Sequence, residues 1–95
     1  MSKLKDQLTS DVAGIILRYV RSHKGRLTEI SNDSRINRRE FNVRGFSRMK
    51  LHRILRILYA LYLDLSYAEF VKMMEEVRTT LTDYGDDYDY TLLDE

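Results

Sequence analysis

Apolar residues recur at steps of three and four along most of the chain, which is the period of an α-helix. A first helix is predicted from Ser2 or Ser10 to His23, because Ser10 is a suitable N-cap and Gly25 is a natural C-terminal stop. Its apolar face carries Leu4, Leu8, Val12, Ile15 and Tyr19. No segment shows the alternation of a β-strand, so the pattern predicts an all-α protein.

Two short helices are predicted next. Thr28 caps a helix that runs to about Asp33. The following helix begins near Asn37 and ends at Gly45, with Ile36 as the buried residue before it. Helices of about two turns do not persist alone, so both must be held by packing.

Two longer helices complete the pattern. A fourth helix, from Ser47 or Arg48 to Leu63, has apolar residues over too wide a surface for one stripe, which predicts the central core helix. Ser66 caps a fifth helix, whose seam at heptad-like spacing is Tyr67, Phe70, Met74, Val77, Leu81, Tyr84 and Tyr88. This seam either folds back on the core of its own chain or forms a dimer interface. The elements together predict a compact five-helix bundle over residues 1–82 and an acidic tail over residues 83–95.

The length and composition are those of one soluble domain. The chain has 95 residues and no cysteine, which excludes disulfides and thiolate metal sites. No apolar run approaches the ~20 residues that a membrane-spanning helix needs. No apolar stretch precedes Asp11 either, so a secretory signal is not expected and the location is expected to be cytoplasmic.

Charge is strongly segregated along the chain, although the formal net charge is only +1. Residues 1–56 hold 14 Lys and Arg and five acids, a net of +9. Residues 57–95 hold two basic and ten acidic residues, a net of −8. Such asymmetry indicates a nucleic acid or another anionic surface as the partner of the basic part. The alternative is two solvated faces of one bundle.

Signatures of catalysis or metal binding are scarce. His23 and His52 are far apart and each lies among Arg and Lys, which repel a metal ion. Glu75 and Glu76 are adjacent on a helix and therefore do not form a paired-carboxylate site. The tail acids lack the spacing of a calcium-binding loop. We therefore expect neither an enzyme nor a bound cofactor.

The basic residues concentrate between residues 35 and 56. Arginine reads guanine through a bidentate fork, asparagine does the same for adenine, and both also hold phosphate. A short helix that exposes Asn37, Arg38, Arg39 and Asn42, with Phe41 turned inward as its anchor, has what a reader of a DNA groove needs. By composition alone the stretch is a basic surface patch.

Five segments of the chain match a known pattern. They are LRYVRSHKG at the end of the first helix, LTEIS in the second, SRIN at a turn, RREFNVRG, and MKLHRILRILYALYLDLSYAEF. Together they resemble the lambda-repressor-like helix-turn-helix family of the Cro and xenobiotic-response-element type, over roughly residues 16–70. The resemblance implies a helix-turn-helix within the bundle and a small regulator of transcription that binds double-stranded DNA.

The resemblance also implies roles for residues. A recognition helix from about Asn37 to Arg44 would enter the major groove, with Asn37, Arg38, Arg39 and Asn42 as the residues for bases. The phosphate contacts would be Arg21, Lys24, Arg26, Thr28, Arg44 and Arg48. The implied form is a homodimer on a roughly palindromic operator. Its first-choice interface is Tyr67, Phe70, Met74, Val77 and Leu81, and its second choice is Leu4 with Leu8.

The chain departs from the family pattern at three places. The segment Gly25–Ile30 is one residue short, and Thr28 stands where the family usually has Gln. The segment between Phe41 and Gly45 is two residues short. At the turn, Arg35 replaces a residue that is often glycine.

A second function also fits this scaffold, because a fold does not fix a function. It is a non-catalytic protein-interaction or antitoxin-like module, whose basic face docks an acidic partner. RNA binding ranks third, since no aromatic platform is interleaved with the basic residues. Within the basic stretch, Glu40 is expected to pair with Arg44 four residues on.

Overall fold

The chain folds into helices only. A computed structural model describes residues 3–87, with side chains from residue 7 to residue 85, so Leu4, Tyr88 and the tail from residue 88 lie outside the description. The elements are α1 (Lys3–Val20), α2 (Arg26–Ser34), the 3-10 turn η1 (Arg38–Glu40), α3 (Val43–Arg48), α4 (Leu51–Asp64) and α5 (Tyr67–Asp87). The described residues contain no strand. The predicted all-α fold with five helices is therefore confirmed.

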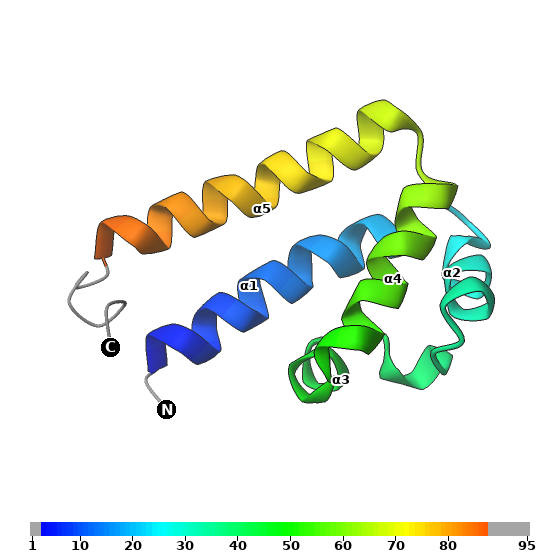
Figure 1. Ribbon diagram of the computed structural model, residues 1–95, viewed down its shortest axis with the longest axis horizontal. Coiled ribbons are helices and arrows are strands. Elements are labelled where there is room, and N and C mark those ends of the chain that lie inside the picture. Colours follow the sequence, from blue (N-terminus) through cyan, green and yellow to red (C-terminus); the bar gives the residue numbers. More distant parts are fainter. Residues whose placement is uncertain (1–2, 88–95) are drawn as a thin grey trace.

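The helices form two groups. The long helices α1 and α5 lie side by side and run in opposite directions, while α2, α3 and α4 form a second group beside them (Figure 1). Every helix and the loop segments around η1 contribute to one core, whose largest fully buried apolar side chains are Val20, Ile30, Ile36, Phe41, Ile57, Leu61 and Met73. The inward orientation predicted for Ile36 and Phe41 is confirmed.

The first predicted boundaries need correction. α1 runs unbroken from Lys3 and ends at Val20, so Ser10 lies inside the helix and does not cap it. Gly25 has a left-handed φ of 85°, a conformation that glycine adopts freely, but it directly precedes α2 as its N-cap residue. α2 therefore begins at Arg26, two residues before the predicted cap Thr28.

The predicted helix from Asn37 to Gly45 is wrong. The chain instead makes the 3-10 turn η1 and then starts α3, and each begins at an asparagine cap: the side chain of Asn37 accepts from the backbone N–H of Arg39, and that of Asn42 accepts from Gly45. Gly45 lies within α3 and does not end a helix. The fourth predicted helix is likewise too long, because residues 47 and 48 belong to α3 and α4 starts at Leu51.

α5 folds back on its own chain, as one of the two interpretations of its seam expected. Met73 is fully buried, whereas Met74 of the predicted seam is exposed, so the buried face is displaced by one position there. The cap at Ser66 is confirmed, since its hydroxyl accepts from the backbone N–H of Glu69. α5 continues past Gly85 to Asp87. The helix therefore extends five residues beyond residue 82, where the sequence placed the end of the helical domain.

Glu76 ties α5 to α1. Tyr19 and Arg18 of α1 both donate to its carboxylate. The hydrogen bond from Tyr19, followed by the Arg18 guanidinium, holds the pKa of Glu76 below its ordinary value of 4.5. A lowered pKa in the folded state stabilises the fold above the ordinary pKa, and this stabilisation is lost as the pH falls through the lowered value.

We expect Tyr19→Phe to lower the free energy of unfolding at pH 7 by about 1 kcal/mol, because a partly exposed hydrogen bond to a carboxylate is screened by solvent. The difference from wild type should shrink as the pH falls through the lowered pKa of Glu76, where the carboxylate becomes protonated. Urea denaturation followed by circular dichroism, in a series of buffers from pH 7 into the acid range, measures the difference at each pH. A difference that stays constant over the whole series would assign the effect of Tyr19 to packing.

Candidate nucleic-acid interface

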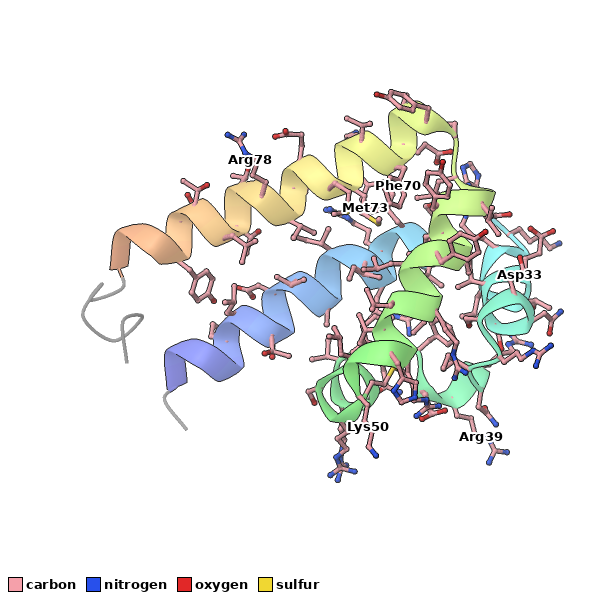
Figure 2. The ribbon with its side chains drawn as sticks, viewed as in Figure 1. Asp33, Arg39, Lys50, Phe70, Met73 and Arg78 are labelled. Carbon is pink, nitrogen blue, oxygen red and sulfur yellow. The ribbon has the colours of Figure 1, made fainter. Side chains whose placement is uncertain are left out.

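The candidate interface is built on η1, α3 and the start of α4. Figure 2 shows Arg39 and Lys50 projecting at the same end of the molecule, on the side away from α5 and its Arg78. Most of the basic residues between positions 35 and 56 of the sequence therefore lie close together at this end of the molecule.

Alternation of buried and exposed residues produces this surface. Phe41 and Phe46 are buried and pack edge to face, with ring centroids 6.0 Å apart at an interplanar angle of 62°. These rings anchor η1 and α3 to the core. The residues between and beside the anchors therefore point outward, and five of them are cationic: Arg38, Arg39, Arg44, Arg48 and Lys50.

These five residues, which we call the basic face, have no acidic partner among the described residues. Four other arginines of the described part do have one. Arg18 pairs with Glu76, for example, and Arg78 pairs with Glu75. The basic face thus keeps its charge available for an external anion.

One acid lies within this region, and it is already neutralised. Arg53 of α4 donates two hydrogen bonds to the carboxylate of Glu40, at 2.9 and 2.7 Å. The Arg53 guanidinium holds the pKa of Glu40 below its usual value. The predicted pair of Glu40 with Arg44 is therefore wrong, and Arg44 stays free for other contacts.

The basic face includes a shallow hollow of about 350 Å³. Its wall contains three guanidinium groups of the basic face and the ion pair of Glu40 with Arg53. The lining residues are Arg39, Glu40, Asn42, Arg44, Gly45, Arg48 and Arg53. A concave site with several convergent arginines suits the oxygens of a phosphate group.

The two asparagines predicted to read bases serve the local backbone. Asn42 accepts from Gly45 at 2.7 Å through Oδ1 and donates to the carbonyl of Arg39 at 2.7 Å through Nδ2. Asn37 uses its Oδ1 for the N–H of Arg39 at 2.9 Å. Bidentate recognition of adenine needs both ends of the amide. In this conformation neither asparagine offers both, whereas Arg38 and Arg39 remain exposed.

Arg26 is not available as a phosphate contact. Its side chain is only 8% exposed. It donates to Asp64 at 3.1 Å, to Glu69 at 3.4 Å and to the carbonyl of Tyr19 at 3.3 Å. The residue therefore joins the ends of α1 and α4 to the starts of α2 and α5, and its predicted role at DNA is wrong.

The other predicted phosphate contacts occupy different places. Arg21 is exposed and donates to the backbone carbonyl of Phe41, which holds it beside η1. Lys24 and Thr28 are also exposed, in the turn before α2 and in its first turn. Arg44 and Arg48 belong to the basic face. Lys50, which precedes α4 as its N-cap residue, was in the basic stretch but was assigned no contact from the sequence.

The residues predicted for a dimer interface differ in how exposed they are. Phe70 and Val77 are half-buried in their own chain, whereas Tyr67, Met74 and Leu81 are exposed. Leu8, from the second choice, lines an apolar hollow of about 270 Å³ between α1, α3 and α4. The exposed members of the first set lie seven residues apart along α5 and do not by themselves form a continuous apolar surface. Such a surface lies on α4, where sequence reasoning had expected a core helix.

Comparisons of the chain with protein-family models, with curated proteins and with solved structures returned no match. Within residues 3–87, no three His, Asp or Glu side chains gather as metal ligands. No described helix is long and apolar enough to cross a bilayer. The feature of the described residues that indicates a function is therefore the basic face, with its geometry and its charge.

Proposed function

We propose that this protein binds double-stranded DNA through the basic face and acts as a small regulator of transcription. The observation that carries the proposal is the convergence of five exposed cations at one end of the bundle, none of them with an acidic partner among the described residues. Duplex DNA carries one negative charge per ~1.7 Å of its axis, and the release of its counterions drives binding to such a surface.

The split of the expected recognition helix changes which residues would read sequence. Arg38 and Arg39 on η1 remain the candidates for bases, because arginine forms bidentate contacts with guanine in the major groove. Arg44, Arg48 and Lys50 flank them on α3 and at the start of α4, as phosphate contacts would. In this proposal two short elements replace one long recognition helix.

The double variant Arg44→Ala/Arg48→Ala is expected to bind a DNA duplex of random sequence with an affinity at least about tenfold lower than that of the wild type at low salt. It should also reduce the slope of log affinity against log salt by about two, one for each lost phosphate contact. Fluorescence anisotropy with a labelled duplex measures both. The matched control is Lys72→Ala/Arg78→Ala on α5, which removes the same charge far from the basic face and should leave the slope unchanged.

Selection of bound duplexes from a random pool tests sequence specificity. A recovered consensus that Arg38→Ala relaxes at one position supports base reading by that residue. Absence of duplex binding even at low salt contradicts the proposed function, and would favour the alternative in which the basic face docks an acidic protein.

A further inference from the structure

α4 carries an apolar stripe that the described residues of the chain leave uncovered. Leu51, Leu55, Tyr59 and Tyr62 follow each other at steps of four, four and three, so they share about a quarter of the helix circumference. Their exposed fractions are 72%, 53%, 63% and 60%. The opposite side of α4 is the one that packs in the bundle, through Ile57, Ala60 and Leu61.

The tyrosines of this α4 stripe are held in place by ring contacts. Tyr59 and Tyr62 stack with centroids 6.3 Å apart, and Tyr62 meets Phe70 of α5 edge to face at 5.5 Å. Side chains that are ordered before binding lose less entropy when a partner covers them. Beside the stripe, a hollow of about 460 Å³ between α2 and α4 includes Leu55 and Tyr59 in its wall. The stripe therefore has both protruding rings and a recess.

The size of the stripe matches half of a dimer interface. An aromatic side chain offers ~150 to 250 Å² when uncovered, so the two tyrosines and two leucines together expose on the order of 500 Å². Interfaces are roughly 60% apolar, and a stable one covers ~800 Å² per partner. A stripe of this area with a polar rim therefore supplies one complete side of an interface.

The rim favours a second copy over a strongly charged partner. Asp33, Arg35 and Arg56 line the hollow beside the stripe, and none of them forms an ion pair with a described residue. Both signs of charge are thus present on one rim. A surface with this mixture complements another copy of itself better than it complements a wholly acidic or wholly basic surface.

We infer that the α4 stripe is the contact between two copies of this chain, related by a two-fold axis that runs along α4. The direction of the axis rests on the proposed function. α4 starts at the basic face, so an axis along α4 turns both basic faces to the same end of the dimer, where one duplex reaches both. An axis across α4 would turn them to opposite ends.

Sedimentation equilibrium without DNA tests the contact. The wild type should be a dimer at about 50 to 100 µM, because interfaces of standard size have dissociation constants in the micromolar range or tighter. The variant Leu55→Lys/Tyr59→Lys should be a monomer with an unchanged circular dichroism spectrum. The matched control Met74→Lys/Leu81→Lys places the same charges on exposed apolar positions of α5 and should remain a dimer. A monomeric wild type, or dissociation by the α5 control instead of the α4 variant, overturns the proposal.

Cross-linking of introduced cysteines tests the axis, because the chain has no cysteine of its own. Leu51→Cys and Tyr62→Cys should each form disulfide-linked homodimers on oxidation, since an axis along α4 brings identical positions together. A mixture of the two variants should give little mixed product, because the positions lie about 16 Å apart along the helix and a disulfide bridges Cα atoms only within ~7 Å. Predominantly mixed product would overturn the axis along α4.

The two proposals fail separately. Sedimentation and cross-linking use no DNA, so a monomeric chain that binds duplex contradicts the dimer alone. A dimer that binds no duplex contradicts the proposed function, and with it the reason for the axis direction, which cross-linking then determines independently.

Discussion

Replacement of Arg26 with alanine is expected to lower the free energy of unfolding by about 3 kcal/mol, because its removal leaves the partly buried carboxylates of Asp64 and Glu69 without their guanidinium partner. The guanidinium is 8% exposed and donates to Asp64 and Glu69, which are 21% and 34% exposed. Domains of this size have ~5 to 10 kcal/mol of stability in total. A single side chain thus supports a large part of the fold.

The expected fall in melting temperature is about 15 °C, since 1 kcal/mol corresponds to ~4 to 8 °C in a domain of 60 to 100 residues. Arg78→Ala is the matched control. Its pair with Glu75 is exposed at both ends, 75% and 59%, so its loss should change stability by less than about 0.5 kcal/mol. Equal effects of the two replacements would contradict the structural role of Arg26.

The same variant separates structure from DNA contact. At a temperature where Arg26→Ala is still folded, its affinity for duplex should equal that of the wild type, because the side chain does not reach the basic face. Selective loss of affinity in a fully folded sample would return Arg26 to the phosphate contacts that the sequence suggested.

Helical periodicity predicted the fold class and the long elements well. α1 and α5 have sustained steps of three and four, and Ser66 caps α5 as the sequence predicted. The anchors Ile36 and Phe41 were also predictable, since they are the apolar positions of a polar stretch. These features depend on residues near one another in the sequence.

The candidate site was less predictable because its details depend on contacts between distant residues. Arg26 looks like any cation of the basic half, and only the approach of Asp64 and Glu69, 38 and 43 residues away, makes it a core residue. Glu40 pairs with Arg53, which lies 13 residues further along the chain, and not with the nearby Arg44. The asparagines could be read as base contacts or as caps, since the same amide serves both.

α4 shows the limit of hydrophobic patterning most clearly. An apolar residue on a helix is compatible with a core contact or with an interface, and the period is the same in both cases. Leu51 and Leu55 lie on the helix that the sequence predicts as the central core helix, yet both are more than half exposed. The width of the apolar surface was the available signal, because a helix buried on one side needs only one stripe.

Gly45→Ala is expected to destabilise the fold by about 2 to 3 kcal/mol, although alanine normally favours a helix over glycine by ~1 kcal/mol. α3 crosses the backbone of η1 at this residue. A Cβ at Gly45 would lie 2.2 Å from the carbonyl oxygen of Glu40 and 2.9 Å from its carbonyl carbon. Backbone atoms cannot move aside as a flexible side chain does, so α3 and η1 must separate.

Separation of these two elements should also disturb the basic face, because Arg39 lies on η1 and Arg44 on α3. Gly45→Ala should therefore weaken duplex binding even at temperatures where circular dichroism shows a folded protein. The matched control is Gly14→Ala in α1, where a new Cβ has no heavy atom within 4 Å. That replacement should raise stability by ~0.5 to 1 kcal/mol and leave binding unchanged. The same substitution thus has opposite signs at two helical positions, and stabilisation by both would show that α3 does not press on η1.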